Sequence, residues 1–270
     1  MNKSNKDAIL VISFGTSYEN TRERTIGAIE KRIAEDFKGY EIRRAFTSGM
    51  IINKLRERDG IEIDTVDKAA QRLADEGFRR VIVQPTHVMN GYEYDKLSDM
   101  IEPYRTRFDA LICGSPLLSS DNDYIQTIEA IADETPEMKD SETAVVFVGH
   151  GTGHFANASY AAFAYRLGTM GYNNCFVGTV EAFPDIDDVM ERVRATGAKK
   201  VLLLPLMIVA GDHVINDIGG EDKDTWLTRF RKAGYETRCV RKGLGEYEGI
   251  RRIFSDHVRE SLNRLSHSEL

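Results

Sequence analysis

The sequence predicts an α/β fold made of two similar Rossmann-like halves, whose parallel sheets face each other across a cleft. Two observations lead to this prediction: apolar strands alternate with helical segments along the chain, and the landmarks of the first half recur in the second. With 270 residues, of which 41% are hydrophobic, the chain can bury the cores of two small domains. Strands that alternate with helices form parallel sheets, because each helix must cross back over the sheet.

Two strand ends recur in the second half of the chain. The matching segments are AILVISFGTS (8–17) with AVVFVGHGTG (144–153), and VIVQPTHVMNG (81–91) with VLLLPLMIVAG (201–211). In the first pair, a buried-type strand ends at a Gly-Thr turn. In the second pair, Pro85 aligns with Pro205, and Gly91 aligns with Gly211. The repeat therefore indicates that each half carries the same two central strands.

The segments between these landmarks complete each half. Helical spacing is found at 21–37, 64–76, 160–170 and 186–196, and strand patterns are found at 40–46 and 174–182. Gly77 and Gly197 follow two of these helices as helix-ending residues. Residues 121–135 and Pro136 form a helix and a short polar linker, and residues 246–265 form a final amphipathic helix.

The predicted strands and helices divide the chain into four parts. They are an N-terminal α/β half (1–120), a bridging helix and linker (121–140), a C-terminal α/β half (141–245) and a C-terminal helix (246–270). Terminal helices of duplicated α/β proteins often cross back onto the opposite domain, but the sequence leaves open whether this one packs on the N-terminal half. A ligand of such a fold binds beyond the carboxyl ends of the strands.

Composition excludes several classes of function. The net charge is -7 with interspersed signs, so no basic stripe is available for nucleic acid. The longest apolar run, 201–210, contains Pro205 and is about half of the ~20 residues that span a membrane. The cysteines are odd in number and form no C-x-x-C, namely Cys113, Cys175 and Cys239. We therefore expect a cytoplasmic protein with neither nucleic acid nor a membrane as its partner.

Differences between the two copies point to the chemistry. At three strand ends the first copy differs from the second, pairing Phe14 with His150, Thr47 with Glu181 and Glu93 with His213. Four of these six residues could bind a metal, and all four follow strand ends: His150, Glu181, His213 and Glu93. Imidazoles with carboxylates suit Co2+, Ni2+, Fe2+ or Zn2+. These residues would not fill the coordination shell of the metal, which suits a site from which the metal must be released.

Structural roles compete with these functional ones. A lone histidine at a strand end is more often a hydrogen-bonding loop residue than a ligand. Clustering and the glycines on either side of His150 favour function, because glycines let backbone approach a bulky ligand. We expect His154 to lie outside the ligand set and His87 to be structural or at the edge of the ligand. The acids at positions 185, 187 and 188 complement a helix N-terminus.

Three motifs resemble the class II chelatases. They are VGHGT (148–152), PTHVMNGYEY (85–94) and PLMIVAGDH (205–213), in the order found in that family. The resemblance covers nearly the whole chain and is greatest to the branch that inserts cobalt into sirohydrochlorin in anaerobic cobalamin biosynthesis. It implies a tetrapyrrole cleft and Co2+ as a substrate bound by His150 and His213, with help from Glu93 or Glu181. No organic cofactor is expected.

The resemblance also implies a reaction and its alternatives. Metal insertion releases two pyrrole protons, and we expect His150, Glu93 and Glu181 to hold the metal and relay protons. Expected contacts to the macrocycle are Ser13, Phe14, Thr16, Met89, Tyr92 and Thr152. Ferrochelatase or nickel-chelatase activity on a related tetrapyrrole, and a carrier that binds without catalysis, remain alternatives. The sequence leaves the number of subunits open, a homo-oligomer included.

Overall fold

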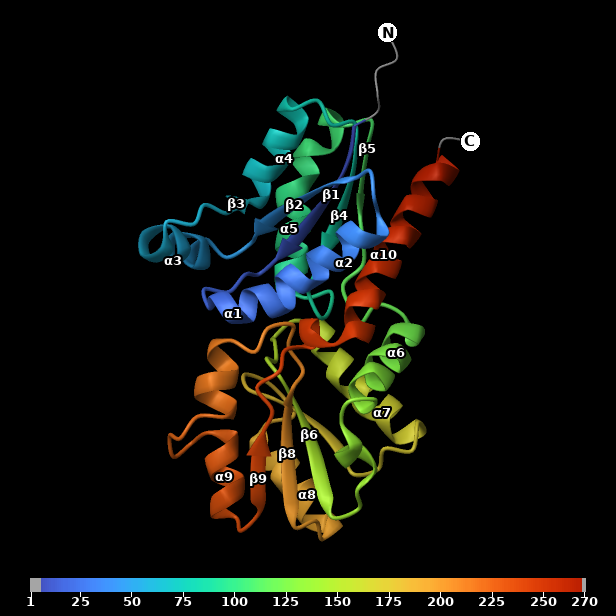
Figure 1. Cartoon of the computed structure of the whole chain (residues 1–270). Helices are drawn as coiled ribbons and strands as arrows, with labels where there is room; N and C mark the ends of the chain where they lie inside the picture. The colour runs from blue at the N-terminus through green and yellow to red at the C-terminus, as the bar shows by residue number, and fades with distance from the viewer. Residues whose placement is uncertain (1–5, 269–270) are drawn as a thin grey trace. The chain divides into compact units, whose positions relative to one another are not determined.

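The computed structural model describes residues 6–268 and divides the chain into two compact units (Figure 1). The first unit consists of Met1–Ser119 and Arg251–Leu270, and the second of Ser120–Ile250. Each unit contains one sheet, in which every strand pair is parallel. The structure thus confirms the predicted fold class of two parallel-sheet α/β domains.

The first unit has five strands in the order β3-β2-β1-β4-β5. They are β1 (Asp7–Ser13), β2 (Glu41–Phe46), β3 (Asp64–Thr65), β4 (Arg80–Pro85) and β5 (Ala110–Cys113). Its helices are α1 (Glu19–Arg22), α2 (Ala28–Asp36), α3 (Gly49–Asp59), α4 (Val66–Asp75), α5 (Tyr92–Ile101) and most of α10 (Glu248–Ser268). A π-helical turn, Glu23–Gly27, joins α1 to α2, and a 3-10 turn, Glu102–Arg107, follows α5.

The second unit has four strands in the order β7-β6-β8-β9. They are β6 (Thr143–Gly149), β7 (Cys175–Thr179), β8 (Lys200–Pro205) and β9 (Glu236–Cys239). Its helices are α6 (Asp121–Ala132), α7 (Ala158–Thr169), α8 (Ile186–Thr196) and α9 (Trp226–Lys232). Short turns complete it, namely the 3-10 turns Pro136–Lys139, Phe155–Asn157 and Leu244–Glu246, and the π-helical turn Val214–Ile218.

The sequence pattern explains why these elements form. The β1 residues from Ala8 to Ile12 are fully buried, as expected for a central parallel strand covered on both faces. Helix α4 buries Val66, Ala69, Ala70 and Leu73, the i, i+3, i+4, i+7 stripe of an amphipathic helix, in the core that contains β1. The order β2-β1-β4-β5 matches β7-β6-β8-β9, so both units place their repeated strands alike.

Several local predictions can be compared with the structure. The predicted helix at 21–37 is α1, a π-helical turn and α2 in succession, so the segment is helical but not one regular helix. Gly77 and Gly197 have φ of +82° and +73° at helix ends, as predicted. Asp185 caps α8, and its side chain accepts hydrogen bonds from the backbone N–H groups of Asp187 and Asp188.

Of the two segments outside the repeat, the bridging helix lies in the second unit, and all but the first three residues of the C-terminal helix lie in the first. From Arg251 onward, α10 is part of the first unit, where the Ser255 hydroxyl donates to Asp36 Oδ2 at 2.5 Å. His257 Nδ1 lies 3.1 Å from the carbonyl oxygen of Ser115 in the same unit. Helix α6 belongs to the second unit.

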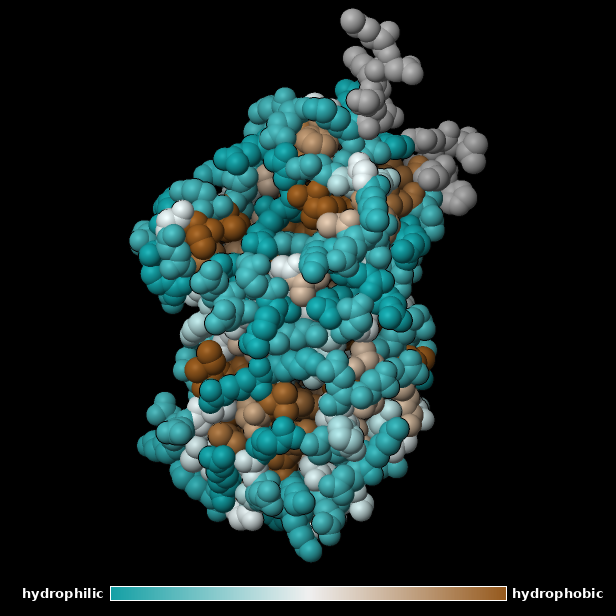
Figure 2. Space-filling view, viewed as in Figure 1, coloured by the Kyte–Doolittle hydropathy of each residue, from teal (hydrophilic) through white to brown (hydrophobic). Residues whose placement is uncertain are grey.

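Surface composition agrees with the absence of a membrane span from the described helices. The face shown in Figure 2 is mostly hydrophilic, with small hydrophobic patches. Within residues 6–268, no helix combines the length and the apolar character that crossing a bilayer requires.

His87, in the loop after β4, is a histidine whose ring nitrogens are shielded from solvent. Both of its ring nitrogens are buried, and neither has a hydrogen-bond partner within residues 6–268. Burial lowers the pKa of His87 to about 4, and the carboxylate of Glu93 opposes this shift only in part. The ring is therefore neutral at physiological pH. Of the two roles expected of His87, structural or at the edge of the ligand, the buried ring nitrogens favour the structural one.

We expect the free energy of unfolding of the first unit to fall as the pH falls from about 6.5 to about 4. In this range His87 is protonated in the unfolded chain but stays neutral in the folded protein, so protonation favours unfolding. Protonation of His87 should lower the free energy of unfolding by about 3 kcal/mol. The His87→Leu variant should lack this pH-dependent decrease. Hydrogen exchange of β4 peptides at pH 7 and pH 4.5 would measure the difference, with β8 of the second unit as an internal reference. Identical pH profiles for variant and wild type would refute the prediction.

Candidate metal centre

The second unit brings His150 and Glu181 together by pairing β6 with β7. Their register places Gly149 opposite Thr179 at the carboxyl ends of both strands. Two further backbone hydrogen bonds extend this pairing, from Val180 N to the Gly149 oxygen at 3.0 Å and from Glu181 N to the His150 oxygen at 2.8 Å. Glu181 therefore lies beside His150 because the two loops leave the sheet in register.

His213 comes from the loop beyond β8, the neighbour of β6 on its other side. The Leu206 N–H donates to the oxygen of Val148 at 2.8 Å, so this loop also leaves the sheet beside the end of β6. His213 immediately precedes the π-helical turn Val214–Ile218. π-helical turns are rare in proteins, and many of those that do occur lie at functional sites.

The three side chains form a compact cluster. The Nε2 atoms of His150 and His213 are 3.1 Å apart, and His150 Nδ1 is 3.7 Å from Glu181 Oε2. One ligand atom from each residue lies within 4.8 Å of the others. Two nitrogens bound to one cation at about 2.1 Å are about 3 Å apart, so the imidazoles are already spaced as ligands of a single ion.

Hydrogen-bond partners fix the direction of both lone pairs. His213 Nδ1 lies 2.7 Å from Asp217 Oδ2, and His150 Nδ1 lies 2.9 Å from the carbonyl oxygen of Gly151. Since a carboxylate and a carbonyl only accept, both Nδ1 atoms carry hydrogen. The two Nε2 atoms are then the ring positions left to bind a cation, and they lie 3.1 Å apart with the ring planes at 85° to each other.

Two glycines let the loop around His150 pack closely. A Cβ on Gly149 would lie 2.1 Å from Cε1 of Tyr160, and Gly151 has a φ of +87° with Ala182 N only 2.8 Å from its Cβ position. The Gly151 N–H donates to the Tyr160 hydroxyl at 3.2 Å. Burial raises the pKa of Tyr160, which keeps this hydroxyl protonated. The glycines predicted to allow close approach thus serve first to hold His150 in place.

Glu93, the fourth predicted ligand, belongs to the first unit. It lies in the first turn of α5, where its Oε2 accepts from the Thr47 hydroxyl at 2.8 Å and is 3.8 Å from Lys96 Nζ. Thr47 and Glu93 are the positions that the repeat aligns with Glu181 and His213. The duplication therefore places equivalent residues side by side in both units.

The predicted contacts to the macrocycle differ in exposure. Phe14 and Tyr92 are 46% and 60% exposed, and Thr152 is partly exposed. Three others are nearly buried, namely Ser13 (2%), Thr16 (5%) and Met89 (9%). The Ser13 hydroxyl is within 2.7 Å of the Thr86 hydroxyl. Burial favours a structural role for these three side chains, because they offer little surface to a ligand.

Two residues beside the cluster, Asp217 and Asn157, were not among the site residues that the sequence predicted. Asp217, which fixes the His213 ring, lies four residues beyond it, and this i, i+4 spacing was a detectable signal. Asn157 links the loops of His150 and Glu181: its Oδ1 accepts from Thr152 N at 3.1 Å, and its Nδ2 donates to the Phe183 oxygen at 2.7 Å. No periodic pattern predicts such a link. The cluster consists of His150, Glu181 and His213 and does not include His154.

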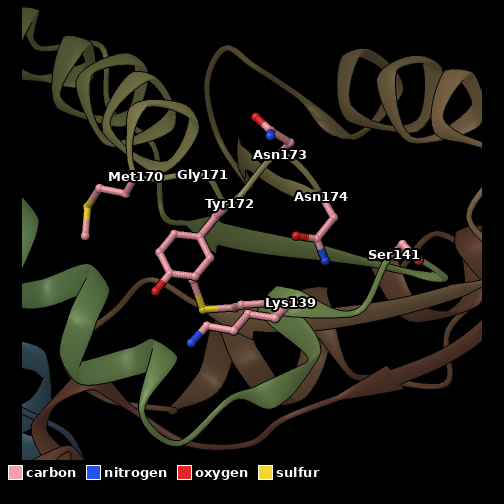
Figure 3. A pocket seen from close by; sticks show the side chains of 8 residues that line it. Lys139, Ser141, Met170, Gly171, Tyr172, Asn173 and Asn174 are labelled. Carbon is pink, nitrogen blue, oxygen red and sulfur yellow. The ribbon is translucent and has the colours of Figure 1, made fainter.

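A separate hollow lies at the other edge of the same sheet (Figure 3). It measures about 530 Å³ and is lined by Lys139, Ser141, Tyr172 and their neighbours, which precede β6 and β7. Asn174 Nδ2 lies within 3.0 Å of three backbone oxygens there, those of Glu137, Asp140 and Thr143, so both of its hydrogens have acceptors. This hollow contains none of the candidate site residues.

Known proteins match the chain along nearly its whole length. Residues 7–263 match the family model described as cobalt chelatase (CbiK). The chain is 44% identical over 258 residues to the sirohydrochlorin cobaltochelatase of Salmonella typhimurium, covering 96% of this chain and 97% of the relative. It is 32% identical over 262 residues to sirohydrochlorin cobaltochelatase CbiKC of Nitratidesulfovibrio vulgaris, covering 96% and 92%.

A solved structure shows the same fold. The sirohydrochlorin chelatase SirB from Bacillus subtilis subspecies spizizenii, solved in complex with cobalt, superposes with a TM-score of 0.67 over 95% of both chains. Its sequence is 14% identical, so this likeness bears on the fold alone.

Proposed function

This chain belongs to the cobalt chelatase (CbiK) family, and we propose on that premise that it inserts Co2+ into sirohydrochlorin with release of two protons. The observation that carries this proposal is the cluster of two imidazoles and one carboxylate: the Nε2 atoms of His150 and His213 are 3.1 Å apart, and one ligand atom from each of these residues and from Glu181 lies within 4.8 Å of the others. Imidazole and carboxylate ligands suit Co2+, and the open side of this shell gives the cation a way out.

The proposed chemistry is an exchange of ligands and protons. His150 and His213 hold the cation on one face of the macrocycle, and Glu181 completes the shell. As Co2+ passes to the ring nitrogens, each imidazole Nε2 becomes free, and a neutral imidazole can then accept a pyrrole proton. Glu181 and Glu93 are the proposed carboxylates that pass these protons outward. Phe14, Tyr92 and Thr152 are the proposed contacts to the macrocycle.

We also propose that the chain works in the cytoplasm. Its three cysteines are free thiols, at positions 113, 175 and 239. Burial raises their pKa to about 11, about 12 and about 11, so they are neither thiolates nor readily oxidised. Free thiols of this kind fit a reducing compartment.

The test is the reaction itself. Purified protein, sirohydrochlorin and Co2+ should give the absorbance change of metal insertion faster than the spontaneous reaction, and faster than with Ni2+ or Fe2+. Protoporphyrin should be a poor substrate. Tight binding of sirohydrochlorin without accelerated insertion would make the chain a carrier, and a preference for Fe2+ or Ni2+ would overturn the assignment of the metal.

A further inference from the structure

Two phenylalanines stand exposed on the loops that carry His150 and Glu181. Phe155 is 83% exposed and lies five residues beyond His150, and Phe183 is 72% exposed and lies two residues beyond Glu181. Single exposed apolar residues are common on protein surfaces, so exposure alone decides little. What sets these two apart is that the structure fixes the loops on which they stand.

The ring of Phe155 packs against a neighbouring aromatic ring. It lies against the His154 ring, with 4.1 Å between the ring centroids and 38° between the planes. His154 is itself held, because its Nδ1 accepts from the Ala156 N–H at 3.1 Å. Phe155 also begins the 3-10 turn Phe155–Asn157, which fixes its backbone. A ring supported in this way loses little conformational entropy when a ligand covers its free face.

The loop of Phe183 is tied to the loop of Phe155 by one side chain. Asn157 donates to the Phe183 oxygen at 2.7 Å while accepting from Thr152 N at 3.1 Å. The Thr179 hydroxyl donates to the Ala182 oxygen at 2.6 Å, which anchors the start of the same loop. The backbone of both phenylalanines is therefore anchored beside the ligand cluster.

We propose that Phe155 and Phe183 form an aromatic wall that contacts the tetrapyrrole and sets its affinity, without binding the metal. This inference rests on the proposed function. A macrocycle that accepts the cation must bring its ring nitrogens within bonding distance of an ion held by His150 and Glu181, and it then lies beside the two loops that carry these rings. A flat conjugated ligand gains from fixed aromatic faces, because stacking needs no matched hydrogen bonds.

Alanine substitutions of each ring test this wall, with Tyr165→Ala as the matched control. Tyr165 is 74% exposed and lies on α7 of the same unit, outside both loops. We expect Phe155→Ala and Phe183→Ala each to raise the Kd and KM for sirohydrochlorin about 3- to 10-fold. The Kd for Co2+ alone and kcat should change less than about 2-fold. Phe183→Tyr should restore macrocycle affinity, because it restores the aromatic face.

The possible failures are distinguishable. If the wild-type protein inserts Co2+ and the double alanine variant binds sirohydrochlorin equally well, the aromatic wall is refuted while the proposed function stands. If the Kd for Co2+ weakens in step with that for sirohydrochlorin, the rings support the metal loops instead of the macrocycle. If the variants change only the number of subunits, the rings belong to an interface between copies. If the wild type itself inserts no metal, the proposed function fails first.

Discussion

Alanine at His150 is expected to reduce Co2+ insertion by more than about 100-fold, close to the rate without enzyme, because changes to residues that merely orient metal ligands already cost 10- to 100-fold. The variant leaves His213 Nε2 with no second nitrogen 3.1 Å away. A single imidazole with a nearby carboxylate holds a divalent cation weakly. His213→Ala should have the same effect for the same reason.

Three measurements distinguish the loss of a metal ligand from the loss of the fold. Absorbance gives the insertion rate, a Co2+ titration without macrocycle gives metal affinity, and fluorescence of Trp226, the chain's single tryptophan, reports whether the second unit remains folded. The double variant should be no slower than either single variant, because ligands of one ion act as a unit. Insertion at more than half the wild-type rate in folded His150→Ala would remove this residue from the mechanism.

The sequence predicted the central part of each sheet but missed its margins. Strands β1, β4, β6 and β8 are apolar runs between recognisable turns, and their repetition identified two parallel α/β units. The outer strands β5 and β9 were missed because they are only four residues long, and β9 reads ETRC, which has no apolar pattern. Helix α3 has a weakly apolar face, with only Ile52 and Leu55 buried, and was missed as well.

The ligand cluster was predictable because parallel strands gather their carboxyl ends at one edge, whatever the loops do in detail. His150, Glu181 and His213 follow three neighbouring strands and meet in one unit. Position at a strand end does not tell which way a side chain points, and Ser13, at the end of β1, and Met89, beyond β4, are both buried. The i, i+4 spacing of His213 and Asp217 could have predicted their contact, whereas the link made by Asn157 depends on loop geometry that no periodicity encodes.

Asp217→Asn is expected to weaken Co2+ binding about 10- to 100-fold, the usual effect of removing a group that orients a metal-ligating histidine. Asp217 Oδ2 accepts from His213 Nδ1 at 2.7 Å, which keeps hydrogen on Nδ1 and a lone pair on Nε2. An asparagine can turn its NH2 group toward Nδ1 and so stabilise the other tautomer. That tautomer carries hydrogen on Nε2, where the cation must bind.

The tautomer and the metal affinity can be measured separately. Nitrogen chemical shifts of the imidazoles should show hydrogen leaving Nδ1 of His213 in the variant, a change that general loosening of the loop would not produce. Asp187→Asn is the matched control, since it removes one negative charge from an exposed α8 residue that pairs with Arg229 in the same unit. If the control weakened Co2+ binding as much as Asp217→Asn, the effect would be one of net charge, and the orienting role of Asp217 would be refuted. If Asp217→Asn bound Co2+ as tightly as the wild type, the orienting role of Asp217 would also be refuted, because the 2.7 Å contact would then contribute nothing to the cation site.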